Sequence, residues 1–331
     1  MDGSILITGG TRGLGFATVR ALLREDAGRH LIIPVRNLTT ARRALAQLTA
    51  QLAPATSGSD GKTSSELGNL HLVECDLGDL ASIRRATAAI GELLDDPGVP
   101  PLRAVAANAG IQLWRDPAQT ADGFEMTFGT NLLGHYLLIR LLTEQTAGLA
   151  SGPVMSQGRI ILVTSSTHWG DFQHTWGMVA PPRWGPVESL ARPATPAPSN
   201  RKATTSAYST SKLGLIYLTH ELARRLPPEF EVYSYNPGLI PGTGLAREAP
   251  AIVQFLSRTF FQSVRMLPGS VGARKSGAEL AQALTGPSPA RSGDYLDRGH
   301  LADSSPESYD PEREKELWEV SAELVGITTA G

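Results

Sequence analysis

Residues 4–15 read S-I-L-I-T-G-G-T-R-G-L-G, a short apolar run followed by a glycine-rich turn. The apolar run predicts a strand, and a helical pattern begins at Gly13. Glycines let the backbone turn sharply and approach a pyrophosphate, which then binds the unpaired N–H groups of the helix N-terminus. An ordinary tight turn is the alternative. The position between a strand and a helix, within about 30 residues of the chain start, favours a dinucleotide site.

Apolar runs alternate with helical patterns along most of the chain, which indicates βαβ units and a parallel sheet. Right-handed crossovers then place helices on both faces of the sheet. The sequence therefore predicts an α/β fold, a doubly wound Rossmann fold with a seven-stranded parallel sheet in a single domain over residues 1–331. The expected strands span residues 4–8, 30–35, 70–75, 103–108, 159–164, 231–235 and about 293–296, and the expected helices span residues 13–24, 40–52, 80–94, 123–146 and 206–226.

Composition restricts the function classes. The 331 residues are 41% hydrophobic, which is ample for one large core, and the formal charge of -2 gives no general attraction to nucleic acid or anionic lipid. No apolar run reaches the ~18 residues of a membrane span, and the first residues lack a signal-peptide pattern. The single cysteine, Cys75, suits a reducing compartment and a packed core position. We expect a cytoplasmic protein without nucleic-acid or membrane partners.

Residues 208–212 read Y-S-T-S-K, which places Tyr208 and Lys212 on the same face of an expected helix. A phenol ordinarily keeps its proton up to a pKa of about 10. A cation roughly 4 Å away, at an effective dielectric near 20, favours the phenolate by about 4 kcal/mol before desolvation is subtracted. The spacing alone occurs by chance in many helices. Together with the nucleotide turn, it indicates a tyrosine that exchanges a proton with a carbonyl or alcohol oxygen.

The T-G-x-x-x-G-x-G spacing of residues 8–15 resembles the short-chain dehydrogenase/reductase family. The resemblance continues in order over residues 4 to about 245. The long segment between the serine and the tyrosine, and the run P-G-L-I-P-G-T-G-L at 237–245, are similar to the branch of retinol dehydrogenases and light-dependent protochlorophyllide reductases. The further matching motifs are Asp76-Leu77, Asn108-Ala109-Gly110, Asn131 in T-N-L-L-G-H-Y, Ser166, Tyr208 with Lys212, and Asn236-Pro237-Gly238.

The resemblance implies a catalytic set of Asn131, Ser166, Tyr208 and Lys212. Ser166 would bind the substrate oxygen, Tyr208 would donate or accept the proton, and Lys212 would lower the pKa of Tyr208 and bind the nicotinamide ribose. Asn131 would hold a water that links Lys212 to solvent. Ser165 is the rival of Ser166, and strand alternation places the two on opposite sides. The expected substrate contacts are Trp114, Ser166, His168 and Tyr208.

The resemblance also implies a nicotinamide cofactor, and two arginines favour NADP(H). Enzymes that use NAD place a carboxylate about 20 residues beyond the glycines, whereas the second strand here is followed by Arg36 and Asn37. Arg12 lies in the glycine turn, and a guanidinium suits a 2′-phosphate. Solvated loop arginines are the alternative. The expected cofactor contacts are Gly9, Thr11, Arg12, Gly13, Leu14, Gly15, Arg36, Asn37, Asp76, Leu77, Asn108, Ala109, Gly110, Tyr208, Lys212, Pro237, Gly238, Ile240 and Thr243.

Residues 167–205 form a proline-rich insertion that contains Trp169, Trp176 and Trp184. Either these rings wall a cavity, as a lid over a bulky apolar substrate, or they anchor a long loop to the surface. Residues 245–331 are expected to supply substrate-side helices and a C-terminal extension. His135, His168 and His174 do not have the spacing of a zinc site, so no metal is expected.

We therefore expect an NADP(H)-dependent oxidoreductase that acts on a carbonyl or alcohol of a bulky, largely apolar small molecule. Reduction of an activated C=C bond is one alternative, and a catalytically silent NADP(H)-binding sensor or scaffold is the other. Members of the family often form dimers or tetramers through the helices around Asn131 and Tyr208, so the resemblance allows a homodimer or homotetramer, and the sequence does not decide the oligomeric state.

Overall fold

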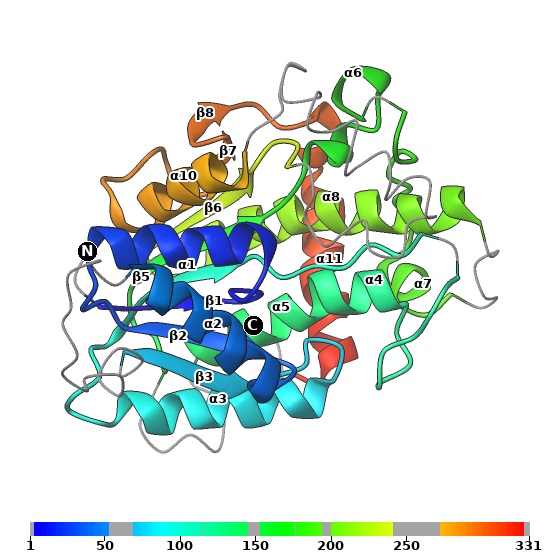
Figure 1. Ribbon diagram of the computed structural model, residues 1–331. Coiled ribbons are helices and arrows are strands. Elements are labelled where there is room, and N and C mark those ends of the chain that lie inside the picture. Colours follow the sequence, from blue (N-terminus) through cyan, green and yellow to red (C-terminus); the bar gives the residue numbers. More distant parts are fainter. Residues whose placement is uncertain are drawn as a thin grey trace.

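An eight-stranded sheet organises the chain in the computed structural model, which describes residues 3–52, 69–114, 116–144, 153–175, 177–193, 200–240 and 272–327 (Figure 1). The strand order is β3-β2-β1-β4-β5-β6-β7-β8, and every neighbouring pair is parallel except β7 with β8. The predicted seven-stranded parallel sheet is confirmed, with one antiparallel edge strand added. The strands are β1 (Ser4–Ile7), β2 (Leu31–Val35), β3 (Leu70–Glu74), β4 (Leu102–Ala107), β5 (Gly158–Val163), β6 (Phe230–Asn236), β7 (Tyr295–Asp297) and β8 (His300–Ala302).

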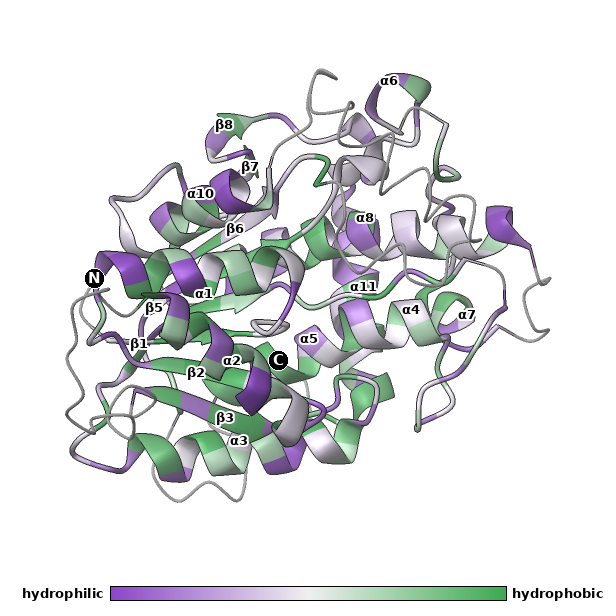
Figure 2. Cartoon of the chain, viewed as in Figure 1, coloured by the Kyte–Doolittle hydropathy of each residue, from purple (hydrophilic) through white to green (hydrophobic). Residues whose placement is uncertain are grey.

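Helices cover both faces of the sheet, as a doubly wound fold requires. On one face lie α1 (Gly13–Glu25), α2 (Leu38–Leu52) and α10 (Ala273–Thr285), with α1 and α10 in direct contact. On the other lie α3 (Leu80–Leu94), α5 (Gly134–Thr143) and α8 (Arg201–Arg225). Alternate side chains of β1 divide between the two cores, since Ile5 and Ile7 join the first and Leu6 joins the second. The inner strands β1 and β2 are accordingly buried along their whole length and mostly apolar (Figure 2).

A C-terminal helix adds a third layer outside α5 and α8. This helix, α11 (Pro311–Val325), crosses α8 and buries Leu317, Trp318, Ala322 and Val325 (Figure 1). The Tyr136 hydroxyl on α5 donates a hydrogen bond to the Trp318 carbonyl at 2.9 Å. The described part of the extension packs on the sheet helices, α10 against α1 and α11 against α8, and residues 241–271 lie outside the described residues.

The expected helix over residues 123–146 is interrupted. It consists of α4 (Met126–Phe128), a π-helical turn η1 (Gly129–Leu133) and α5. π-Turns inside helices are often found at functional sites, and Asn131 lies in this one. Short helices complete the described chain: η2 (Ser166–Trp169), α6 (Phe172–Thr175), α7 (Val187–Ala191) and η5 (Pro306–Ser308).

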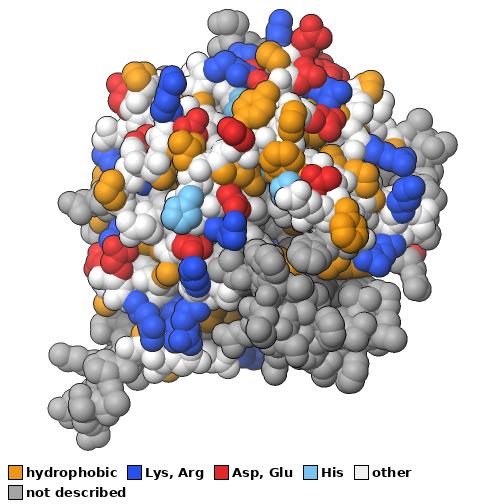
Figure 3. Space-filling view, turned by 90° about the horizontal axis from the view of Figure 1, so that it is seen from above, with side chains coloured by type: hydrophobic (Ala, Val, Ile, Leu, Met, Phe, Trp, Pro, Cys, Tyr) orange, Lys and Arg blue, Asp and Glu red, His pale blue; other side chains and the backbone are white. Residues whose placement is uncertain are grey.

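The surface is of mixed character. The face seen in Figure 3 carries Lys and Arg side chains interspersed with Asp and Glu. Within the described ranges, no helix is both long and apolar enough to cross a bilayer. Cys75 is buried, and burial raises the pKa of its thiol to about 12, as expected for a packed core cysteine.

Candidate active site

The glycine-rich turn between β1 and α1 is shaped by contacts that leave no room for side chains. Gly9 and Gly13 have φ values of +69° and +55°, which other residues rarely adopt. A Cβ on Gly15 would lie 2.5 Å from the Gly9 carbonyl oxygen and 2.6 Å from Nδ2 of Asn108, so α1 packs directly on the turn. Arg12 occupies the N-cap position and makes no capping hydrogen bond. The first N–H groups of α1 therefore remain suited to an anion.

The predicted adenosine contacts lie around the carboxyl ends of β2 and β3. Arg12 and Arg36 are exposed, and neither takes part in an ion pair among the described residues. Asn37 caps α2, because its Oδ1 accepts a hydrogen bond from a backbone N–H three residues later at 2.8 Å. Asp76 shapes the turn after β3, because its Oδ1 accepts a hydrogen bond from the Gly78 N–H at 2.9 Å. Of the other predicted contacts in these loops, Thr11 is half-buried, and Leu14 and Leu77 are buried.

The Asn131 side chain hydrogen-bonds both the loop after β4 and α8, the helix that carries Tyr208. Its Oδ1 accepts a hydrogen bond from the Ile111 N–H at 2.8 Å, and its Nδ2 donates to the Ile111 carbonyl and to the Ser211 hydroxyl, both at 3.0 Å. A Cβ on Gly110 would lie 3.3 Å from Asn131 Oδ1 and 3.6 Å from Nζ of Lys212. The Asn108-Ala109-Gly110 turn therefore lies beside Lys212, and the Asn131 side chain is occupied by protein partners.

A buried histidine joins Asn131 to the nucleotide turn. His135 Nδ1 lies 2.8 Å from the Asn131 carbonyl, and its Nε2 lies 2.9 Å from the Thr8 hydroxyl. That hydroxyl also accepts from the N–H groups of Asn108 and Ala109 at 2.9 Å. A carbonyl only accepts, so Nδ1 carries the proton and Nε2 accepts from Thr8. Burial lowers the pKa of His135 to about 4, which keeps the ring neutral.

Tyr208 and Lys212 lie close together, but their electrostatics differ from the expectation. Lys212 Nζ donates to the Val163 carbonyl at 2.8 Å and lies 5.6 Å from the centre of the Tyr208 ring. Burial raises the pKa of Tyr208 to about 12, although its hydrogen bond with the Ser165 side chain lowers it, and burial lowers the pKa of Lys212 to about 7. Burial therefore dominates the pKa of Tyr208 in this geometry, and the expected lowering by Lys212 is not found.

The two serines after β5 point to different partners. Ser165 is extended, with φ -160° and ψ 149°, its hydroxyl accepts a hydrogen bond from the Thr167 N–H at 3.3 Å, and it lies near enough to Tyr208 to lower the pKa of the phenol. Ser166 begins the 3₁₀-helix η2, and its hydroxyl donates to the His174 carbonyl at 3.3 Å. Of the two serines, Ser165 therefore lies beside Tyr208, which disfavours the prediction that Ser166 binds the substrate oxygen. The helical turn that begins at Ser166 directs that side chain away, and Ser165 is the residue that sequence reasoning set aside.

The segment at the end of β6 lies against the loop that follows β5. Asn236 Oδ1 accepts from the N–H groups of Ser166 and Gly238, both at 3.2 Å, and Gly238 has a φ of +74°. The Pro237 carbonyl accepts from a serine of α10 at 3.0 Å, and Ile240 is buried. The predicted contact Thr243 lies outside the described residues.

The expected substrate contacts His168 and Trp114 have protein partners. His168 is fully buried, and its two ring nitrogens bond the Ser165 carbonyl and the Ser305 N–H. A substrate contact is therefore wrong for His168, because neither ring nitrogen is available. The Arg201 guanidinium lies over the Trp114 ring at 5.1 Å, at the start of α8. Among the described residues, no three His, Cys, Asp or Glu side chains gather in a way that would hold a metal.

Part of the insertion is bound along α8. We call residues 180–187 the strap. The Ala180 and Pro181 carbonyls accept from serine hydroxyls of α8 at 2.7 Å, and the Arg183 N–H donates to the Thr210 hydroxyl at 2.9 Å. The Trp184 ring meets Tyr217 edge-on at 4.7 Å. The strap is therefore an anchored segment, which explains why the sequence around Tyr208 is rich in Ser and Thr.

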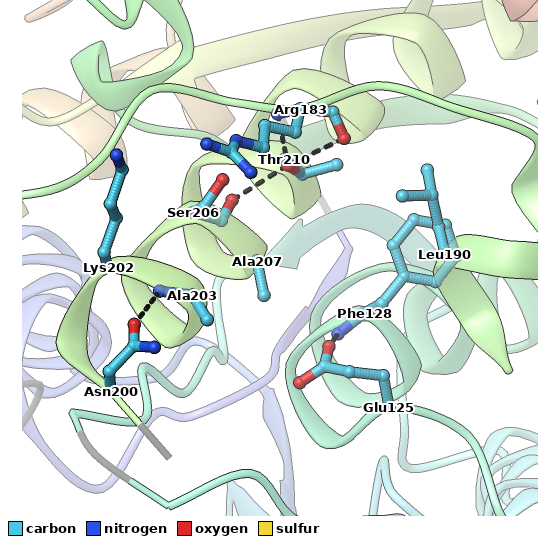
Figure 4. A pocket seen from close by; sticks show the side chains of 10 residues that line it. All are labelled: Glu125, Phe128, Arg183, Leu190, Asn200, Lys202, Ala203, Ser206, Ala207 and Thr210. Atoms are coloured by element: carbon cyan, nitrogen blue, oxygen red, sulfur yellow. Dashed lines mark hydrogen bonds between the residues drawn. The ribbon is translucent and has the colours of Figure 1, made fainter. Parts of the chain in front are cut away.

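A cavity of about 340 Å³ lies beside the N-terminal half of α8 (Figure 4). The α8 residues that line it follow helical spacing, whereas Tyr208 and Lys212 lie about half a turn away around the helix. The cavity is therefore separate from the Tyr208 site. Its lining comprises Glu125, Phe128, Arg183, Leu190, Asn200, Lys202, Ala203, Ser206, Ala207 and Thr210.

Known proteins resemble this chain over most of its length. The family model of the short chain dehydrogenases matches residues 4–174. The chain is 33% identical to protochlorophyllide reductase B of Oryza sativa subsp. japonica, over 98% of this chain and 78% of that protein. It is 32% identical to the protochlorophyllide reductase of Avena sativa, over 98% of this chain and 99% of that protein.

Solved structures share the architecture. An NADPH-bound carbonyl reductase from chicken fatty liver matches with a TM-score of 0.56 at 20% identity, over 90% of this chain and 98% of that one. A levodione reductase matches with a TM-score of 0.58 at 18% identity, over 95% of this chain and 98% of that one. At these identities the likeness shows the fold.

Proposed function

Because this chain belongs to the short-chain dehydrogenase family, we propose that it transfers hydride between NADP(H) and a small organic molecule. The observation that carries the proposal is the arrangement of Ser165, Tyr208 and Lys212 beside the turn that follows β4. A proton donor and a hydrogen-bonding hydroxyl there can act together on one substrate oxygen. The activity expected is that of an oxidoreductase.

The residues around the glycine turn fit a dinucleotide. Gly9 and Gly13 supply the positive φ values of the turn, and a Cβ on Gly15 would collide with the Gly9 carbonyl oxygen, so α1 begins directly against the turn. Arg12 and Arg36, both exposed, would bind the 2′-phosphate that distinguishes NADPH from NADH. The cofactor supplies the hydride, and the protein supplies orientation and the proton.

The chain's own residues divide the remaining work. Tyr208 holds the proton, since burial keeps its phenol protonated at neutral pH. Ser165 would bind the substrate oxygen beside that phenol. Lys212 is fixed by the Val163 carbonyl and lies next to Gly110, where it would bind the nicotinamide ribose. Asn131 holds the loop after β4 in register, and its carbonyl, which accepts from His135, would also hold the predicted water.

Two reactions remain candidates. Reduction of a ketone or aldehyde, or oxidation of the corresponding alcohol, uses Tyr208 and Ser165 on one oxygen. Reduction of an activated C=C bond is favoured by the 32–33% identity to protochlorophyllide reductases over nearly the whole chain. In that reaction Tyr208 would protonate carbon rather than oxygen. The bulky, apolar substrate expected from the sequence suits either reaction.

The test is NADPH oxidation by the purified protein with a panel of bulky ketones, aldehydes and conjugated alkenes. We expect turnover with wild type, and at least a tenfold loss in Tyr208→Phe with NADPH binding retained, because general acid catalysis typically contributes about 10²–10⁴-fold. If the protein binds NADPH but oxidises it with none of these substrate classes, it would instead be a sensor or scaffold. A cytoplasmic location stays a prediction.

A further inference from the structure

His168 joins the active-site serine to a distant part of the chain. Its Nδ1 lies 2.6 Å from the Ser165 carbonyl, and its Nε2 accepts a hydrogen bond from the Ser305 N–H at 3.1 Å. The ring is fully buried, and Tyr295 packs edge-on against it with the ring centres 5.3 Å apart. Residues 165 and 305 are thus held together through one imidazole.

The two partners fix the tautomer of the ring. A carbonyl oxygen only accepts hydrogen bonds, so Nδ1 must carry the proton. A backbone N–H only donates, so Nε2 must be bare. Burial lowers the pKa of His168 to about 4, in agreement with a neutral ring. Protonation would set two donors, Nε2–H and the Ser305 N–H, against each other.

Ser305 belongs to a turn that is held by its own hydrogen bonds and is hydrogen-bonded to α8. The Ser304 and Ser308 hydroxyls lie 2.6 Å apart, and Ser308 donates to the Ser305 carbonyl at 2.6 Å. The Tyr217 hydroxyl of α8 donates to the Glu307 carbonyl at 2.7 Å. The turn therefore holds a fixed position relative to α8, which also carries Tyr208.

We propose that His168 is a positioning residue for Ser165: it ties the serine backbone to the C-terminal turn, so that the serine hydroxyl stays against the Tyr208 phenol. The inference rests on the proposed function and deepens it. Ser165 follows β5 where the sheet has ended, and the polypeptide turns into η2 directly after it. The tie to Ser305 supplies the rigidity that the strand no longer provides at this residue.

The experiment is a double-mutant cycle on turnover. His168→Leu fills the space but makes neither hydrogen bond, whereas His168→Gln keeps one donor and one acceptor. A displacement of about 1 Å at a reacting group costs about 10²-fold in rate. We expect His168→Leu to lower kcat by about 10²-fold with the NADPH dissociation constant unchanged, and His168→Gln to recover most of this loss. In a Ser165→Ala background, His168→Leu should lower kcat no further.

Additive losses in the double mutant would overturn the proposal, because they would mean that His168 acts independently of Ser165. His71→Gln is the matched control, a half-buried histidine near the opposite end of the sheet, and should retain wild-type kcat. Imidazole ¹⁵N NMR separates this inference from the proposed function. A wild type without turnover ends the proposed function. In that event the His168 resonance is identified as the one that disappears only in the His168 variants. An Nδ1–H tautomer for this ring at pH 7 supports the tie, and an Nε2–H tautomer or a charged ring overturns it.

Discussion

At the scale of single residues, the site depends on which serine faces the tyrosine. Ser165 lies beside Tyr208 and lowers the pKa of its phenol, whereas the Ser166 hydroxyl donates to a backbone carbonyl of α6. Loss of one donor to the reacting oxygen typically costs about 10²–10³-fold in kcat. We expect a loss of this size in Ser165→Ala and less than threefold in Ser166→Ala, measured by steady-state kinetics with NADPH. The reverse order would restore Ser166 as the catalytic serine.

Two buried histidines make stability sensitive to acid. The pKa values of His135 and His168 are lowered by burial from the ordinary 6.5 to about 4. Between these pH values the unfolded chain binds more protons than the folded chain, so stability falls as the pH decreases from 6.5 to 4. Each of these pKa shifts corresponds to about 3 kcal/mol in the free energy of unfolding. The charged groups near these rings are Lys212 for His135, and Asp171, His174 and Asp297 for His168.

Urea unfolding at a series of pH values from 7 to 4 measures this effect. His168→Gln should lose less stability over the interval than wild type, because one of the two titrating groups is gone. His300→Gln removes an exposed histidine and should follow the wild-type curve. Equal pH dependence in all three proteins would mean that other groups cause the acid sensitivity.

At the scale of elements, we expect two loops at the carboxyl edge of the sheet to set the cofactor preference. Arg12 precedes α1 and Arg36 follows β2, where NAD-dependent folds place an acid. Each charge-assisted contact is worth about 1.5–3 kcal/mol. We expect the wild type to prefer NADPH, and Arg12→Ala/Arg36→Asp to shift the ratio of kcat/KM values toward NADH by about 10²-fold or more. A wild type that prefers NADH would contradict the assignment.

The strap is expected to stabilise α8 rather than to gate the site. Trp184 packs against Tyr217, and a Cβ on Gly214 of α8 would lie 3.2 Å from its ring. Trp184→Ala should lower the free energy of unfolding by about 3 kcal/mol, measured by urea denaturation. Phe172→Ala is the control, since Phe172 is in the same insertion and 73% exposed. It should change stability by less than about 0.5 kcal/mol. Similar losses in both would argue against the anchoring role.

The elements differed in how far the sequence could predict them. Buried parallel strands such as L-I-I-P-V (Leu31–Val35) are apolar on both faces, so their runs are plain in the sequence. The glycine turn is equally plain in the sequence. Only glycine fits at position 15, because a Cβ there would lie 2.5 Å from a carbonyl oxygen. The choice between Ser165 and Ser166 was not predictable from strand alternation, since alternation ends where η2 begins. The burial that governs the pKa of Tyr208 depends on tertiary packing and leaves no local pattern.

At the scale of the whole molecule, α11 and the strap determine which surfaces are free. All residues of α5 from Gly134 to Leu142 are buried within the single chain. On α8, the residues from Thr204 to Leu218 are buried except Ala207. The apolar side chains of α11 form one core with these helices, and the strap binds the outer face of α8. The helices around Asn131 and Tyr208, through which the resemblance allows a dimer or tetramer, are already covered.

We therefore predict a monomer at micromolar concentration, which sedimentation velocity measures directly. A stable dimer requires about 1,200 Å² or more of buried surface, and these helices have little apolar surface left to contribute. Trp318→Glu on α11 should expose the apolar sides of α5 and α8, because Trp318 is 4% exposed and Arg140 and Arg225 lie over its ring. That variant should lose stability and self-associate. Lys315→Glu on the exposed side of the same helix should remain monomeric and stable. A wild-type dimer that Lys315→Glu disrupts would show that the outer face of α11 is itself the interface.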